Sequence, residues 1–405
     1  MPIRRMAAMA VSPHSSKKPD YAELIVALAC GLAITTTVLI LAAMPFNRHF
    51  ASSRDFIVYW ATGQQLAHHS NPYDANLMGQ MERAGGFDRV GSFYTRNPPW
   101  SLPLMLPLGF VGARVAALPW SLLLVCILIV AVRMLWTMFG RRGSHLEWLG
   151  YCFPPALQCV IMGQTSLFLL LGLALFLKLH RGRPFWAGAT LWLCTLKPHL
   201  FVPFGLVLLL WIVVSRSWRV LAGVATAMTA SCAAIQIIDP AVWGQYAHWA
   251  GSSGIAHEAI PTLGVALRNV MAPQANWLIF VPCAMGSVWA LGYFWTRRAN
   301  WDWLEHGNVL MMVSVLVAPY CWVLDQCVVL PAVLYGACRT HSRAALAALG
   351  AIYLMLELQP LCFTAGLNSP WYLWPAPAWL VWYWFARRLA PAESTAALPA
   401  AAHAV

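Results

Sequence analysis

An acidic residue follows the first long apolar run of the chain, in the segment SSRDFIVYW. Asp55 could act as a general base, because partial desolvation at the mouth of a membrane cavity would raise the pKa of its carboxyl toward a useful value. Alternatively, its charge stabilises the N-terminus of the helix that follows, an effect of about 0.3–1 kcal/mol. Sequence pattern alone favours neither interpretation.

A lysine and a histidine in the segment TLKPHL are the second set of residues that could do chemistry. Lys197 lies between two apolar stretches, far from any basic cluster, and an ionisable residue inside a membrane protein is a functional-site hypothesis. The alternatives are that Lys197 extends its apolar stem so that its ammonium reaches the membrane surface, and that His199 is an ordinary interfacial histidine.

Two further polar residues stand in apolar surroundings. Gln164, in the segment MGQTS, could contribute to a site or simply cap or bridge helices. Asp325, in the segment APYCWVLDQ, could contribute to a site or be the structural partner of Lys197 or Arg268.

The composition places the chain among membrane proteins. Of its 405 residues, 60% are hydrophobic and only 10% are charged, too few charges for a soluble domain of this length. The formal net charge of +12 comes from short basic clusters between apolar runs rather than from one basic domain. The positive-inside rule explains these clusters better than nucleic-acid binding does, so we expect no nucleic-acid partner.

Apolar runs and basic clusters together predict the topology. Residues 24–44 can cross a bilayer, which takes about 20 residues, and we interpret them as a retained anchor behind a cytoplasmic tail, residues 1–23. Further helices are predicted near residues 115–139, 147–162, 164–180, 184–197, 199–214, 218–238, 277–296, 305–318, 322–337, 344–359 and 370–387. With the basic clusters in the cytoplasm, this gives an all-α polytopic domain of about twelve transmembrane helices over residues 24–387, and a disordered cytoplasmic tail, residues 388–405.

The first loop on the outer side, residues 45–114, is too long to be a plain connection. Phe56 and Trp60 recur at helical spacing, which predicts a helix along the membrane surface with its aromatic side chains at the interface. The segment NPYD predicts a turn. The proline-broken residues 98–110 are predicted to lie at the outer interface rather than to cross.

The cysteines are uninformative, and the motif content gives no support to nucleotide hydrolysis or to the commoner hydrolase mechanisms. The eleven cysteines are scattered without a Cys-x-x-Cys pair, so free buried thiols are expected. There is no Walker-type glycine loop, no Gly-x-Ser-x-Gly element and no His-Glu-x-x-His signature. His68, His69 and Asp74 are close in sequence, but adjacent histidines on a helix point about 100° apart. We therefore expect no metal and no cofactor.

Eight segments follow one another in a recognisable order. They are DFIVYWATGQQL, NPYD, NPPWSLPLMLPLG, GQTSLFLLLGLALFL, RGRPFWAG, LKPHLFVPFGLVLLL, WRVLAG and APYCWVLDQCVVLPAVL. From about residue 55 to residue 334, this order resembles glycosyltransferase family 87, polytopic enzymes of the GT-C type. The resemblance implies a GT-C fold and transfer of a mannose-like hexose from a polyprenyl-phosphate-linked donor to a hydroxyl of a lipid or glycan acceptor.

The resemblance also implies roles for individual residues. Asp55 matches the acid of the first outer loop and is the candidate catalytic base, and one carboxylate suffices for transfer with inversion. The cations implied for the donor phosphate are Lys197, His199, Arg54 and Arg268. The residues implied for the substrate pocket are Tyr59, Trp60, Gln64, Asn71, Tyr73, Asp74, Gln164, Tyr320 and Asp325.

The predicted location is the inner membrane of a bacterium, with the site on the periplasmic side, where donor, acceptor and membrane lipids would be the partners. A transporter or flippase of a lipid-linked sugar is the alternative, since it would also be polytopic with charges near a cavity. However, the two halves of the chain show neither an inverted repeat nor a matched pair of broken helices. A non-catalytic scaffold would not need Asp55 and Lys197 isolated on one side.

Overall fold

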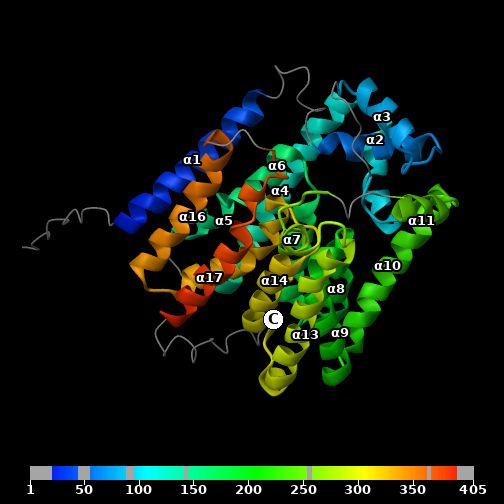
Figure 1. Ribbon diagram of the computed structural model, residues 1–405. Coiled ribbons are helices and arrows are strands. Elements are labelled where there is room, and N and C mark those ends of the chain that lie inside the picture. The colour runs from blue at the N-terminus through cyan, green and yellow to red at the C-terminus, as the bar shows by residue number, and fades with distance from the viewer. Residues whose placement is uncertain are drawn as a thin grey trace, which may run out of the picture.

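The computed structural model describes residues 21–43, 55–87, 95–140, 145–252, 258–362 and 366–389. Within these ranges the regular elements are α-helices and short 3-10 helices, without a strand, packed into a bundle (Figure 1). This confirms the predicted all-α class. The ten cysteines whose side chains are described are free, as the sequence predicts.

Five helical segments are long and apolar enough to cross a membrane. They are α1 (Tyr21–Ala43), α4 (Ala113–Phe139), α10 (Trp218–Ile238) and the segments Pro198–Ser215 and Asn276–Asn300, which contain α9 (Val202–Ser215) and α13 (Val281–Arg297). Of the five, α10 buries the smallest share of its most apolar stretch, 11%. Apolar surface of this kind suits a lipid environment and supports a membrane protein, while the twelve crossings stay a prediction.

The other helices fill the rest of the bundle or continue the segments just named. The α-helices among them are α2 (Phe56–Ala67), α3 (Ala75–Ala84), α5 (Glu147–Tyr151), α6 (Pro154–Met162), α7 (Ser166–Leu179), α8 (Pro184–Thr190), α11 (Val242–Ser252), α12 (Leu263–Met271), α14 (Trp303–Val317), α15 (Leu330–Arg339), α16 (Arg343–Cys362) and α17 (Pro375–Arg388). The 3-10 helices are η2 (Pro99–Leu104), η3 (Leu106–Phe110), η4 (Leu191–Leu196), η5 (Pro198–Phe201), η7 (Asn276–Phe280), η8 (Arg298–Asn300), η9 (Val323–Val329) and η10 (Pro370–Tyr372).

Prolines divide several predicted crossings into shorter helices. The helix predicted at residues 147–162 is α5 followed by α6, because Pro154 disfavours a helical conformation at the residue before it. The helix predicted at residues 184–197 is α8 followed by η4, which ends where Lys197 precedes Pro198. Lys197 has φ −136° and ψ 73°, outside the helical region. The lysine is therefore presented at a backbone break and not within a continuous helix.

Helix α2 forms where the sequence predicts it, but it does not expose its aromatic face. Phe56, Tyr59 and Trp60 are 0%, 4% and 6% exposed, so the prediction that they lie at the membrane interface is wrong. Helix η3 packs on α2 where Gly63 meets Gly109, since a Cβ on either residue would collide with the backbone of the other helix. Helical spacing identifies an apolar face but not the element that covers it, which is why the sequence did not show this burial.

Two ion pairs on the loops and helix ends lie at the opposite end of the bundle from the polar turns. Helix α7 runs from Ser166, in the MGQTS turn, toward the loop in which Arg181 pairs with Asp302 at 2.9 Å. At the same end, Glu305 near the start of α14 pairs with Arg387 near the end of α17. Helices α2, α3 and α11 gather at the other end of the bundle (Figure 1). The turns predicted to carry the site thus share one end.

Candidate active site

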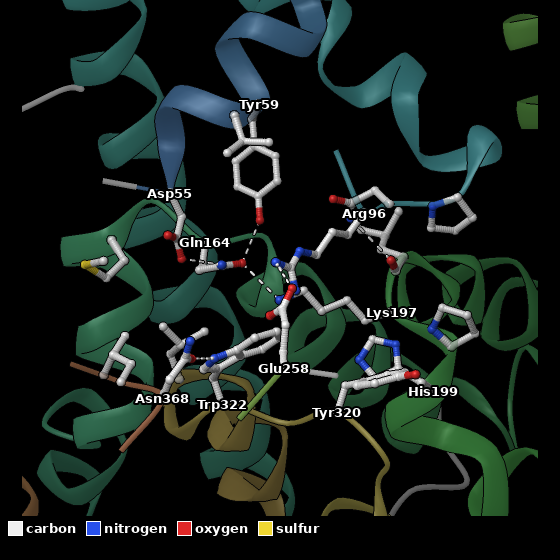
Figure 2. A pocket seen from close by; sticks show the side chains of 18 of the residues that line it. Asp55, Tyr59, Arg96, Gln164, Lys197, His199, Glu258, Tyr320, Trp322 and Asn368 are labelled. Atoms are coloured by element: carbon white, nitrogen blue, oxygen red, sulfur yellow. Dashed lines mark hydrogen bonds and ion pairs between the residues drawn. The ribbon is translucent and has the colours of Figure 1, made fainter. Parts of the chain in front are cut away.

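A cavity of about 760 Å³ lies at the end of the bundle where the polar turns meet (Figure 2). Six residues that the sequence predicts for the site line it: Asp55, Tyr59, Gln164, Lys197, His199 and Tyr320. Further polar and aromatic residues of its wall are Arg96, Asn97, Tyr246, Trp249, Glu258, Trp322 and Asn368. The wall is therefore assembled from turns and helix ends spread along the chain.

Asp55 is the N-cap residue of α2, but its carboxylate does not cap the helix. Its Oδ2 atom instead accepts a hydrogen bond of 2.5 Å from Nε2 of Gln164. Burial raises the pKa of Asp55 above its ordinary value, while the bond from Gln164 and the positive charge of Lys197 lower it in part. A carboxylate with a raised pKa at a cavity wall has the properties of a general base.

The side-chain amide of Gln164 is oriented by two donors on the side away from Asp55. The Tyr59 hydroxyl donates to Gln164 Oε1 at 2.6 Å, and Lys197 Nζ donates to the same atom at 3.0 Å. Because Oε1 accepts both bonds, the NH₂ group must face Asp55. Gly163 makes the turn possible, since its φ of 73° is left-handed and ends α6 just before Gln164.

Lys197 links the hydrogen bonds of Gln164 to a buried acid, Asp325. Its Nζ atom donates to Asp325 Oδ1 at 2.6 Å and to Ser166 Oγ at 3.0 Å, in addition to Gln164. Each of the three ammonium hydrogens therefore has an acceptor. Lys197 connects Asp325 to Gln164, and through Gln164 to Asp55.

Asp325 lies behind the cavity wall, with a side chain that is 0% exposed. Its carboxylate also accepts hydrogen bonds from the Ser166 hydroxyl at 2.6 Å and from the backbone amide of Trp322 at 3.1 Å. A buried charge needs a partner of opposite charge and full hydrogen bonding, and Asp325 has both. Of the partners considered from the sequence, it pairs with Lys197 and not with Arg268.

A second ion pair lies on the cavity wall, and the sequence reasoning did not find it. Arg96 donates from Nη1 and Nη2 to the two carboxylate oxygens of Glu258, at 3.0 and 2.8 Å. The two side chains are 32% and 30% exposed, so this pair is open to the cavity. The available signals were positional: Arg96 directly precedes the Asn-Pro-Pro-Trp element, and Glu258 is an acid within the outer loop at residues 239–276.

Aromatic side chains complete the wall. Tyr246 and Trp249, one turn apart on α11, are stacked with ring centroids 5.7 Å apart and an interplanar angle of 24°. His199 and Tyr320 meet edge to face with ring centroids 5.7 Å apart. Within the part of the chain that the structure describes, Nε2 of His199 is buried without a hydrogen-bond partner. A polar group of a ligand would satisfy this nitrogen.

The sequence of residues 94–319 matches the model of glycosyltransferase family 87, over more than half of the 405-residue chain. The chain belongs to glycosyltransferase family 87. The match confirms the resemblance seen in the sequence and makes the protein a glycosyltransferase. It includes Lys197 and the Arg96–Glu258 pair, whereas Asp55 lies N-terminal to it. Comparisons with curated proteins and with solved structures found no match.

The NPYD segment of this glycosyltransferase forms the predicted turn, one layer behind the cavity wall. Asn71 Oδ1 accepts a hydrogen bond from the Tyr73 amide at 2.9 Å, and Asp74 caps α3 by accepting from two of its backbone amides. The Tyr73 hydroxyl donates to the Asn97 carbonyl at 2.8 Å, and its ring lies 5.3 Å from that of Tyr246. Tyr73 thus supports two lining residues, Asn97 and Tyr246, while Asn71 and Asp74 shape the turn, and none of the three lines the cavity.

Three other predicted site residues of the glycosyltransferase, Trp60, Gln64 and Arg268, do not line the cavity. Trp60 Nε1 and Gln64 Nε2 both donate to the carbonyl of Val111, at 2.8 and 3.3 Å, and so hold the chain just before α4. Arg268 lies on α12, where its guanidinium donates to the side chain of the next residue. Arg54 lies outside the residues that the structure describes.

Proposed function

We propose that this glycosyltransferase moves a mannose-like hexose from a polyprenyl-phosphate-linked donor to a hydroxyl of a lipid or glycan acceptor, with inversion. Asp55 is the general base of the proposed reaction. The observation that carries the proposal is the Asp55 carboxylate at the cavity wall, held by Gln164, whose orientation Tyr59 and Lys197 fix. One positioned carboxylate is enough for an inverting displacement.

The proposed reaction is a single displacement. Asp55 takes the proton of the acceptor hydroxyl while the acceptor oxygen forms a bond to the anomeric carbon. The bond between that carbon and the phosphate oxygen breaks, and its electron pair leaves with the polyprenyl phosphate. The proton on Asp55 then passes to water, which restores the base. A raised pKa suits this role, because a more basic carboxylate accepts the hydroxyl proton more readily.

The cavity wall offers groups for both substrates. The stacked rings of Tyr246 and Trp249 present aromatic surface on which a sugar ring can pack. The buried Nε2 of His199 suits a hydroxyl or phosphate oxygen. Lys197, for which the sequence suggests a contact with the phosphate, is assigned a positioning role, because acceptors within the protein already occupy its ammonium. The proposal includes no metal and no cofactor.

The proposed orientation places the cavity on the periplasmic side of a bacterial inner membrane. Arg181 belongs to the basic cluster Lys178, Arg181 and Arg183, and Arg387 to the pair Arg387 and Arg388. Both residues lie at the end of the bundle opposite the cavity. Basic residues are enriched in cytoplasmic loops, so the cavity end is assigned to the other side. The polyprenyl chain of the donor would remain among the membrane lipids while its phosphate reaches the cavity.

Sugar transfer by the purified protein from a labelled polyprenyl-phosphate hexose tests the proposal. The product should carry the anomeric configuration opposite to that of the donor, as NMR can determine. Asp55→Asn should lower kcat by about 10²–10⁴-fold. Asp302→Asn, the same change at the opposite end of the bundle, is the matched control and should retain turnover.

Three outcomes would contradict parts of the proposal. Full turnover by folded Asp55→Asn would rule out the base, and retained anomeric configuration would rule out a single displacement. Movement of the lipid-linked sugar across vesicles without transfer to any acceptor would favour a transporter instead.

A further inference from the structure

The two ion pairs at the cavity differ in how available they are to a ligand. Lys197 and Asp325 are 12% and 0% exposed, and the ammonium is fully hydrogen-bonded. Arg96 and Glu258 are 32% and 30% exposed. The Glu258 carboxylate takes one N–H from each Nη atom, whereas a guanidinium has five N–H groups. Among the described contacts of the cavity, Arg96 is therefore the cation with donors left for another anion.

The backbone on both sides of Arg96 is anchored. The Thr95 hydroxyl is buried and lies 2.6 Å from the hydroxyl of Thr62 on α2. On the other side, the Asn97 carbonyl accepts the Tyr73 hydroxyl at 2.8 Å. The Arg96 side chain thus extends from a fixed segment, which lowers the entropy lost when it binds a ligand.

The Trp322 ring contacts the Arg96 guanidinium. Its ring centroid lies 5.6 Å from Cζ of Arg96, within the range of a cation–π contact. The indole is itself fixed, because Nε1 donates to Asn368 Oδ1 at 2.7 Å. In the view of Figure 2 the guanidinium reaches the middle of the cavity, between Asp55 and His199. An anion bound there would share the cavity with the proposed base and with His199, whose Nε2 has no hydrogen-bond partner among the described residues.

We propose that Arg96 receives the phosphate of the lipid-linked donor, and that Glu258 is a resident counter-ion which this phosphate displaces. The inference rests on the proposed function, since it requires a donor with a phosphate leaving group. Phosphate oxygens match the planar fork of arginine in the same bidentate way as a carboxylate. A partly exposed ion pair adds little net stability, so one anion can replace the other at small cost.

The charge of the phosphate changes during the reaction in a direction that favours Arg96. In the donor the phosphate is a diester with one negative charge, and cleavage of the bond to the sugar turns it into a monoester with additional negative charge. Arg96 therefore binds the leaving group more strongly than it binds the donor, which lowers the barrier. Return of the Glu258 carboxylate to Arg96 then assists release of the polyprenyl phosphate.

Binding of undecaprenyl phosphate and of undecaprenol, its phosphate-free counterpart, to the purified protein tests the inference. The wild type should prefer the phosphate lipid. Arg96→Gln should lose about tenfold or more of its affinity for the phosphate lipid and none for the alcohol, as expected for charged hydrogen bonds. Glu258→Gln should bind the phosphate lipid more tightly, because the competing charge is gone. Arg181→Gln, on an exposed ion pair at the opposite end, is the matched control and should bind as the wild type does.

The outcomes separate the inference from the proposed function. Equal binding of the two lipids by the wild type would overturn the donor class and the inference with it. A phosphate preference that survives in Arg96→Gln would overturn the inference alone. If Glu258→Gln bound the phosphate lipid more weakly than the wild type does, displacement of Glu258 by the phosphate would be overturned. If phosphatidic acid competed as well as undecaprenyl phosphate does, the assignment of the site to the donor would be overturned. Arg96→Lys keeps the charge without the fork and should lose part of the preference; full retention would contradict the bidentate contact.

Discussion

Nε2 of Gln164 lies 2.5 Å from the Asp55 carboxylate, although the two residues are 109 positions apart in the chain. The contact joins the start of α2 to the turn between α6 and α7. Tyr59 and Lys197 fix the Gln164 amide from the other side, so the surroundings of the carboxylate depend on several elements at once. Changes at these neighbours should therefore alter both the pKa of Asp55 and its position.

The pH dependence of turnover should report the protonation of Asp55. A general base is active when deprotonated, so kcat/KM rises as the pH increases through its pKa. Burial raises the pKa of Asp55 above the ordinary value of 3.8, so the rising limb should lie at higher pH than for an exposed aspartate. A profile of kcat/KM against pH checks this. A rate that stays constant down to the ordinary aspartate range would contradict a buried base.

Gln164→Ala should move the rising limb of the kcat/KM profile to still higher pH. The bond from Gln164 favours the charged carboxylate and so lowers the pKa of Asp55 in part, and its removal leaves the effect of burial less opposed. We also expect kcat to fall by up to about 10²-fold, because the carboxylate loses its fixed position. Parallel pH profiles of wild type and variant measure both effects. A limb at the wild-type pH would show that this bond does not tune Asp55.

Polar residues within apolar segments were the part of the site that could be predicted from the sequence. Asp55, Gln164 and Lys197 stand out because amide and ionisable groups are rare in such surroundings, and the structure places all three at one cavity. Arg96 and Glu258 do not stand out, because charged residues are common in loops. Only the folded chain shows that these two loops meet.

For the helices, too, the sequence predicts local features better than contacts between distant segments. The predicted helix at residues 218–238 coincides with α10, because a long apolar run has clear ends. The burial of α2 could not be predicted in this way, since it depends on the approach of η3 through Gly63 and Gly109. Contacts between distant glycines leave no periodic pattern in a single sequence.

Lys197→Ala should destabilise the protein far more than the loss of an exposed ion pair. The variant leaves Asp325, which is 0% exposed, without its counter-ion, and such losses cost about 3–5 kcal/mol. Arg181→Ala removes a pair whose arginine is 63% exposed and should cost about 0–1 kcal/mol. Thermal unfolding of the purified variants in detergent measures the difference. Equal unfolding temperatures would show that Asp325 does not depend on Lys197.

The double variant Lys197→Met with Asp325→Leu separates the structural role of the pair from its effect on the base. Neither charge of the Lys197–Asp325 pair remains in the interior, so most of the lost stability should return. Activity should stay low, because Gln164 has lost one of the two donors that orient its amide toward Asp55. Unfolding temperature and kcat are measured on the same preparation. Recovery of both would mean that the pair serves folding only.

Gly63→Ala should force α2 away from η3. A Cβ at this position would meet the carbonyl of Met105 and the backbone nitrogen of Gly109, and a rotamer change cannot relieve overlap with backbone. We expect a loss of about 1–3 kcal/mol in stability, together with lower kcat, because Asp55 stands at the start of the displaced helix. Gly112→Ala is the matched control, since a Cβ there has no atom within 4 Å and its φ is −64°. Unfolding temperature and turnover are compared between the two variants, and equal values would contradict the close contact between α2 and η3.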